Sequence, residues 1–136
     1  MRNLLLAIIF LFTLSSQIFS QWVPQNSGTT NRFMTCFFLD DNLGWAAGNL
    51  GTIVKTTNSG QNWTSQSIST TDHIHSIFFA DPLNGWLVLY EFVPDRHGSI
   101  LRTTNGGDSW FTQLTVSGFS LHRIFFTDVY NGYALG

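Results

Sequence analysis

The histidines are the residues whose types and spacing most directly suggest chemistry. His73 and His75 are separated by one residue, so a strand would present both imidazoles on one face, where they could bind a metal ion. Metal sites built from protein side chains usually have at least three ligands, and no third ligand stands at a fixed distance from this pair. A phosphate-binding glycine loop is also absent from the sequence. We therefore expect no metal site and no other cofactor.

The acidic residues do not form the pairs that hydrolases use. Glu91 is the only glutamate, so a retaining glycosidase would need paired aspartates instead. Three aspartates occupy one equivalent position of an internal repeat, which indicates a role in turns: Asp40, Asp81 and Asp128. The others fall in predicted loops without partners at fixed spacing: Asp41, Asp72, Asp95 and Asp108. We expect no catalytic residues and no enzyme activity.

The composition argues against several classes of protein. The 136 residues include 8 acidic and 6 basic side chains, a net charge of −2, so the chain lacks the basic character of a nucleic-acid-binding protein. Charged residues make up 10% and aromatic residues 15%, which favours a tightly packed, strand-rich fold over disorder. Because Cys36 is the only cysteine, it forms no internal disulfide, and we expect it to be buried as a small apolar residue.

The N-terminus has the pattern of a secretory signal peptide. Residues 1–3 include an arginine, residues 4–14 are almost uninterruptedly apolar, and Ser20 is a small residue suited to cleavage. The apolar run is about half of the ~20 residues that a membrane-spanning helix needs, so a retained membrane anchor is the less favoured alternative. We therefore predict a signal peptide at residues 1–20 and a secreted or periplasmic protein without a stable membrane anchor after cleavage.

The rest of the chain, residues 21–136, is an internal repeat. Two octets read TTNSGQNW at residues 56–63 and TTNGGDSW at residues 103–110. The tryptophans at positions 22 and 63 are 41 residues apart, and those at positions 63 and 110 are 47 residues apart. The same two spacings separate the Phe-Phe pairs of successive units. The six extra residues of the second period fall within residues 90–97. We predict that these residues form an enlarged loop, which is either a contact surface or a solvent-exposed loop without a binding role.

Each repeat unit contains short apolar segments separated by turns. A Phe-Phe strand, a strand beginning with Gly-Trp, a Gly-x-Ile strand and a strand opened by Trp-x-x-Gln follow one another. A period in the forties with about four strands is typical of β-propeller blades. We therefore predict an all-β propeller of four-stranded antiparallel blades, incomplete here, with two full blades and parts of others. The repeats cover about residues 22–63, 64–110 and, truncated, 111–136.

The Phe-Phe strand explains why such units need neighbours. In the second unit, Ile77 and Phe79 point to one face of this strand and Phe78 to the other. The equivalent residues are Cys36, Phe38 and Phe37 in the first unit, and Ile124, Phe126 and Phe125 in the third. A strand that is apolar on both faces must be covered on both, so a single blade should not fold alone.

The octets are predicted to be structural. In each copy a threonine ends the third strand, an asparagine can hydrogen-bond the turn backbone, and a glycine permits the positive φ of a tight hairpin. A tryptophan then packs on the apolar strands. These residues are Thr56, Asn58, Gly60 and Trp63 in the first copy, and Thr103, Asn105, Gly107 and Trp110 in the second.

The octets resemble the Asp-box, or BNR repeat, written Ser/Thr-x-Asp-x-Gly-x-Thr-Trp, with Asn58 and Asn105 in place of the aspartate. The fuller unit, over residues 22–136, resembles the repeat of the photosystem II stability/assembly factor family. That resemblance implies a β-propeller, commonly of seven blades, that acts as an assembly factor or as a binding module for a protein or glycan partner. Asp-boxes also occur in sialidases and xyloglucanases, so the motif implies a fold and no activity.

Two functions remain open from the sequence. The first is an exported, non-catalytic propeller used for binding or assembly. The second is the N-terminal part of a secreted glycoside hydrolase of the sialidase or xyloglucanase type, with catalytic residues beyond residue 136. The repeat predicts a further strand and octet after Gly136, so we expect a fragment of a longer protein that supplies the remaining blades; a ring assembled from several copies is the less favoured alternative. Residues 22–25 are then expected to be the outer strand of a closing blade, and a Phe-rich face should be exposed.

Overall fold

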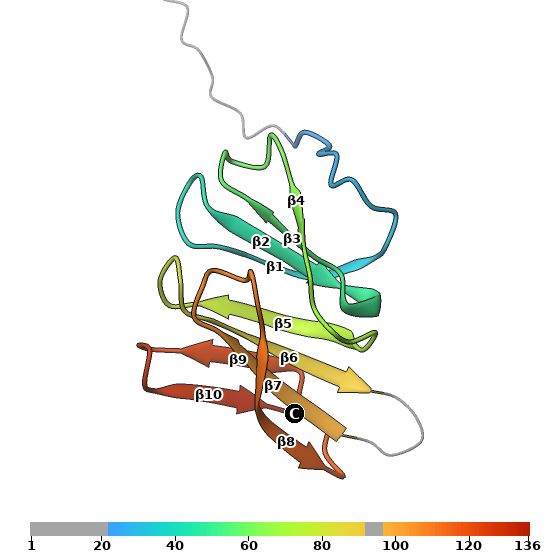
Figure 1. Ribbon diagram of the computed structural model, residues 1–136, viewed down its shortest axis with the longest axis vertical. Coiled ribbons are helices and arrows are strands. Elements are labelled where there is room, and N and C mark those ends of the chain that lie inside the picture. The colour runs from blue at the N-terminus through green and yellow to red at the C-terminus, as the bar shows by residue number, and fades with distance from the viewer. Residues whose placement is uncertain (1–21, 92–96) are drawn as a thin grey trace, which may run out of the picture.

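The structure is a computed structural model that describes residues 22–91 and 97–136. The predicted signal peptide lies outside the described residues, as do Asp95 and Arg96. Within the described residues the chain is built of β-strands, with one 3₁₀ turn, η1, at Asn49–Gly51. Figure 1 shows the strands gathered into successive sheets along the length of the molecule.

The strands form three antiparallel sheets, which we call blades 1, 2 and 3. Blade 1 has the order β1-β2-β3-β4 and consists of Phe33–Phe38, Gly44–Gly48, Ile53–Thr56 and Thr64–Gln66. Blade 2 has the order β5-β6-β7-β8 and consists of His73–Phe79, Gly85–Glu91, His97–Thr103 and Phe111–Ser117. Blade 3 pairs β9, Arg123–Phe126, with β10, Gly132–Leu135. The predicted fold class, an incomplete propeller of four-stranded antiparallel blades, is confirmed.

The blades are joined by stacked aromatic pairs. The ring of Trp45 in blade 1 stacks on Phe79 in blade 2, with centroids 3.5 Å apart and planes 7° apart. Trp86 in blade 2 stacks on Phe126 in blade 3 in the same way, at 3.7 Å and 17°. Trp45, Phe79 and Trp86 are each no more than 1% exposed. The Gly-Trp and Phe-Phe motifs of the repeat are therefore the two halves of one contact between neighbouring blades.

The glycine before each tryptophan provides space for this stack. Gly85 pairs with Phe79 across the β5–β6 ladder, and a Cβ built on Gly85 would lie 2.5 Å from Phe79 Cε1. That distance is too short for any side chain other than hydrogen unless the ring moves. The Phe79 ring thus lies between Gly85 of its own blade and Trp45 of the preceding blade.

The second phenylalanine of each pair forms a row that runs from blade to blade. The ring centroids of Phe37 and Phe78 are 4.9 Å apart, and those of Phe78 and Phe125 are 5.4 Å apart. The Phe-Phe strand β5 is therefore covered on both faces, as the sequence predicted, because Ile77 and Phe79 are also buried.

The prediction that Cys36 is buried is wrong. Cys36 is exposed, and Phe38, which points to the same side of β1, is 45% exposed. The equivalent residues of blade 2, Ile77 and Phe79, are covered by blade 1, whereas no described sheet covers this face of β1, and Phe38 has only an edge contact with Trp63 among the aromatic rings described. The expected exposure of phenylalanines is present here and at Phe125, which is 55% exposed.

Residues 22–25 do not form the expected outer strand. They have no regular secondary structure, and Trp22 is 96% exposed. An outer strand pairs with the third strand of a blade, and both described third strands are already paired, β3 with β4 and β7 with β8. No partner ladder is therefore available to this segment within the described residues.

The extra residues of the second repeat are only partly a loop. Tyr90 and Glu91 extend β6 and pair with Gly98 and His97 of β7. The enlarged loop predicted over residues 90–97 is therefore wrong at both ends, because these residues lengthen the hairpin, while residues 92–96 lie outside the described residues. The equivalent strands of blade 1 are shorter and are joined through η1.

Replacing Gly85 with alanine should lower the free energy of unfolding by about 1–3 kcal/mol, because the added Cβ displaces Phe79 from its stack on Trp45. Gly44→Ala is the matched control. A Cβ there would lie 2.6 Å from Phe38 Cδ1, but that ring is half-exposed and can turn into solvent. Urea unfolding of both variants measures the difference. Equal losses would contradict the role assigned to the stack.

Candidate functional site

The octets form two hydrogen-bonded hairpin turns centred on their threonines. Thr103 Oγ1 accepts a hydrogen bond from the Gly107 backbone N–H at 3.0 Å and donates to Asn105 Oδ1 at 2.9 Å. Asn105 Oδ1 also accepts from the Ser109 N–H at 3.0 Å. In the first copy, Thr56, Asn58 and Gly60 make the same contacts at 2.9–3.0 Å. An asparagine therefore suffices where the Asp-box has an aspartate, because the side-chain oxygen only needs to accept.

The remaining octet residues support the turns. Gly60 and Gly107 have φ of +80° and +97°, the positive values predicted for them. Trp63 lies edge-on to Phe38 at 6.1 Å, and Trp110 lies edge-on to Phe79 at 6.0 Å. Both indole N–H groups are buried without a hydrogen-bond partner among the described residues. The octets thus position outer strands, and their identity as Asp-boxes stays a prediction.

The repeated aspartates close the turn after each Phe-Phe strand. Asp40 Oδ1 accepts from the backbone N–H groups of Asn42 and Leu43 at 2.7 and 2.8 Å. Asp81 and Asp128 accept in the same way from the two residues at equivalent positions, at 2.8 Å. Hydrogen bonds from Leu43 and Asn42 lower the pKa of Asp40. Their prediction as turn residues is confirmed.

The histidines lie at the junction between blades 2 and 3. The His75 ring is 5.4 Å from His122 of the next blade, and Tyr90 lies 5.6 Å from His75 and 5.7 Å from His122. His73 instead accepts a hydrogen bond at Nδ1 from the Leu50 N–H, at 3.4 Å. No group of three metal-binding side chains occurs within the described residues. Sequence reasoning paired His75 with His73 along one strand and so missed its contact with His122 in the next blade.

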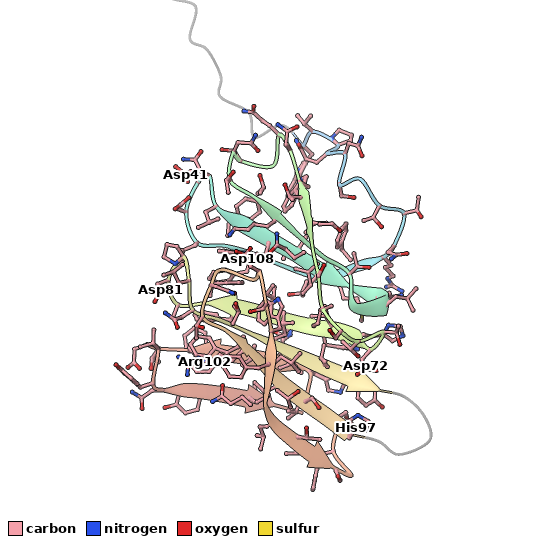
Figure 2. The ribbon with its side chains drawn as sticks, viewed as in Figure 1. Asp41, Asp72, Asp81, His97, Arg102 and Asp108 are labelled. Carbon is pink, nitrogen blue, oxygen red and sulfur yellow. The ribbon has the colours of Figure 1, made fainter. Side chains whose placement is uncertain are left out.

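Acidic side chains in the described part of the chain are spread over different sides of the molecule (Figure 2). Figure 2 shows Asp41 and Asp81 on one side of the molecule and Asp72 and His97 on the other. Arg102 lies over the Trp86 ring at 5.3 Å, and Trp86 stacks on Phe126 in the contact between blades 2 and 3. No helix among residues 22–91 and 97–136 is long and apolar enough to span a membrane.

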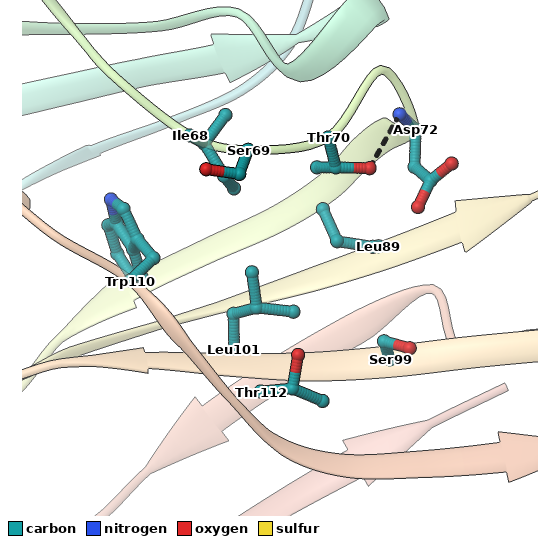
Figure 3. Close-up of a pocket in the computed structure, with 9 residues that line it drawn as sticks. All are labelled: Ile68, Ser69, Thr70, Asp72, Leu89, Ser99, Leu101, Trp110 and Thr112. Carbon is teal, nitrogen blue, oxygen red and sulfur yellow. Dashed lines mark hydrogen bonds between the residues drawn. The ribbon is translucent and has the colours of Figure 1, made fainter.

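A concave feature of the described part of the chain is a groove between blades 1 and 2. It encloses about 280 Å³ and is lined by Ile68, Ser69, Thr70, Asp72, Leu89, Ser99, Leu101, Trp110 and Thr112. Leu89 and Leu101 are buried and make an apolar floor, whereas hydroxyl groups and the Asp72 carboxylate make a polar rim (Figure 3). Because Leu89 and Leu101 present little surface, the exposed lining of this groove is mainly polar, and the groove is a candidate binding site by its concave shape and convergent polar groups.

The wall of this groove is the connection from blade 1 to blade 2, residues 67–72. The buried Gly51 N–H of η1 donates to Asp72 O at 2.9 Å, and the Asp72 N–H donates to Thr70 Oγ1 at 3.1 Å. Gly51 has φ of +64°, and a Cβ on it would collide with the Thr70 carbonyl, so only glycine allows η1 to hold this wall. Sequence reasoning missed the groove because residues 67–72 carry no repeated motif.

No family model matches this chain, and no curated protein matches it. Solved structures of YCF48 do match. The structure of YCF48 bound to D1 peptide is 26% identical, with a TM-score of 0.60, over 71% of this chain and 30% of that one. YCF48 from Cyanidioschyzon merolae is 21% identical, with a TM-score of 0.70, over 85% of this chain and 38% of that one. The chain thus spans 30–38% of the length of these two structures. YCF48 is a photosystem II assembly factor, so the resemblance to that family is confirmed.

Replacing Thr103 with valine should lower the free energy of unfolding by about 1–3 kcal/mol, because the Gly107 N–H and Asn105 Oδ1 lose a buried partner. Thr103 is fully buried. Thr104→Val, at the exposed neighbouring position, is the control and should be close to neutral. Thermal unfolding measures both. A stable Thr103→Val chain would contradict the central role of the threonine hydroxyl.

Acidification should weaken the junction between blades 2 and 3. Burial, followed by repulsion from His122 and His73, lowers the pKa of His75 below its ordinary value of 6.5. The unfolded chain therefore takes up this proton first, so the His75 contribution to stability is complete above pH 6.5 and declines as the pH falls below that value. His75→Gln should make the decline shallower in unfolding curves recorded against pH. An unchanged decline would argue against His75 as its source.

Proposed function

We propose that this chain is part of an exported, non-catalytic β-propeller that binds a polypeptide segment in the groove between blades 1 and 2 and so acts as an assembly scaffold. The observation that carries the proposal is the groove itself, with its apolar floor and polar rim. The matching structure of YCF48 bound to D1 peptide supports the choice of a polypeptide as partner.

The chemistry of the groove suits an extended peptide. Such a peptide needs partners for its backbone N–H and C=O groups and a place for its apolar side chains. Ser69 and Thr112 each offer a hydroxyl that can donate or accept, whereas the Ser99 hydroxyl already shares a hydrogen bond with Thr115 Oγ1 at 3.2 Å. Leu89 and Leu101 form the buried floor beneath them. The Asp72 carboxylate favours a hydrogen-bond donor or a positive charge in the part of the peptide that lies beside it.

Export is proposed from the N-terminal sequence. A charged start, a short apolar run and a small residue before Gln21 suit a cleaved signal peptide. The proposed location is therefore secreted or periplasmic, with no stable membrane anchor after cleavage. A glycan partner remains the alternative ligand for the same face, and a nucleic-acid partner is disfavoured by the net charge of −2.

The absence of catalysis is the second part of the proposal. Asp40, Asp81 and Asp128 are engaged in their own turns, which leaves them poorly placed as acids or nucleophiles. Assays of the chain, and of any longer product that contains it, on sialosides and β-glucans should give no turnover. Measurable hydrolysis that depends on one of these aspartates would overturn this part.

Peptide binding is tested by titrating a fluorescently labelled D1 peptide with the full chain. Thr112→Trp should weaken binding by roughly tenfold, because the indole fills the groove at its rim. Ser65→Trp is the matched control: Ser65 is the exposed residue at the equivalent position of β4, outside the groove. Saturable binding that only Thr112→Trp weakens supports the proposal. Equal weakening by both variants would move the site elsewhere, and no binding would remove D1 peptide as a ligand.

A further inference from the structure

Two histidines from neighbouring blades face each other at the junction between blades 2 and 3. The ring centroids of His75, on β5, and His122, which immediately precedes β9, are 5.4 Å apart, and their planes are tilted by 60°. The two residues stand at the same repeat position, three residues before Phe78 and Phe125, whose rings are also 5.4 Å apart. Successive blades therefore bring equivalent side chains of their inner strands into contact.

A β-bulge directs His75 toward this junction. The ladder pairs Ile74 and Ser76 with consecutive residues of β6, so His75 is the extra residue without a cross-strand partner. Ser76 faces blade 3, where its Oγ accepts a hydrogen bond from the Ile124 N–H at 3.2 Å, and Ile77 packs in the core shared with blade 1. An unbroken alternation would send His75 to the side of Ile77. The bulge re-aims its side chain toward blade 3, which is a common use of bulges beside functional sites.

The surrounding residues hold the two imidazoles in place. The Tyr90 ring is buried and lies 5.6 Å from His75 and 5.7 Å from His122, so it packs against both. The hydrogen bond at Ser76 fixes the backbone of β9 two residues after His122. His75 is half-buried, whereas His122 is exposed. An ion between the two rings would therefore be held by the fold and still be in contact with water.

The distance between the rings matches that of two imidazoles bound to one zinc ion. With each ligating nitrogen about 2.0–2.1 Å from the zinc, each ring centre lies roughly 3.2 Å from the ion, and a tetrahedral angle places the two ring centres roughly 5.2 Å apart. The observed value is 5.4 Å. Imidazole suits zinc and related transition metals, whereas magnesium and calcium take oxygen ligands. Ring packing alone also gives such distances, so metal binding itself has to be measured.

We propose that His75 and His122 form a zinc-binding site that joins blades 2 and 3. No group of three metal-binding side chains occurs within residues 22–91 and 97–136, so water completes the tetrahedral coordination on the exposed side of His122. His73, the partner considered from the sequence, is engaged elsewhere, because its Nδ1 accepts from the Leu50 N–H of blade 1. The site is separate from the groove between blades 1 and 2 and is independent of the proposed function.

Zinc binding is measured by calorimetric titration of the full chain, purified without a histidine tag, with zinc chloride at a pH of about 7.5, where imidazole is neutral. Cys36 is exposed, and a thiolate binds zinc by itself, so every titration uses the Cys36→Ser background. One zinc ion per chain is expected. His75→Gln and His122→Gln should each weaken binding roughly tenfold or more, because one of two protein ligands is lost. Magnesium chloride should not bind.

His73→Gln is the matched control, because it removes a histidine from the same strand and leaves the proposed pair intact. X-ray absorption by the zinc-loaded Cys36→Ser chain is a second measurement and should show two imidazole nitrogens at about 2.0–2.1 Å, with oxygen as the remaining ligands. The proposal is overturned by the absence of saturable binding, by equal weakening in the His73→Gln chain, or by a spectrum without two imidazoles. If a histidine variant does not fold, the absorption spectrum decides.

Discussion

The stacking of a tryptophan on a phenylalanine of the next blade is the interaction on which the rest of this structure depends. The inner strands are apolar on both faces, so each sheet must lie between two others. Burial of aromatic side chains of this size contributes about 2–3 kcal/mol each, and the parallel stack adds shape complementarity that fixes how the two blades face each other. The Trp45–Phe79 contact sets the position of blade 2, and the turns, outer strands and groove follow from that position.

The repeat made most of the fold predictable, since each motif can be checked against its copies. Strand number, strand order and the hairpin turn at Gly107 could all be read this way. The repeat could not predict whether a residue is buried where no described blade covers its strand. Cys36 has the same local sequence pattern as Ile77, yet burial depends on a covering blade, which is not a local property. The segment 22–25 fails as a strand for the same reason, because a strand is defined by its partner.

The candidate site was less predictable than the fold, and the reason is physical. Leu101 and Trp110 stand at repeated positions, but other parts of its floor and rim come from positions where the repeats differ. Leu89 stands where blade 1 has Gly48 and η1 begins, and the longer β6–β7 hairpin carries Leu89 and Ser99. Leu89 packs in the same buried cluster as Trp45 and Phe79, whereas the exposed residues of the rim are less constrained and can vary. An internal repeat identifies the residues that build the scaffold, but it gives no signal for residues that differ between the copies. The contact of His75 with His122 was missed for another reason, because it joins two different blades.

One repeat position holds a lysine in blade 1 and an arginine in blade 2, and the stack between blades explains why both are accepted. Lys55 and Arg102 each extend over the tryptophan that pairs directly across the ladder, Trp45 and Trp86. The cation is attracted by the indole ring, and in blade 1 its ammonium also donates to the octet turn of the next blade. A long side chain with a positive end is therefore required, and either residue meets that requirement. Only arginine carries the additional Nε donor, which is why the Arg102 position has a hydrogen-bonding capacity that Lys55 does not have. One repeat position thus places a positive charge over the tryptophan of each blade contact.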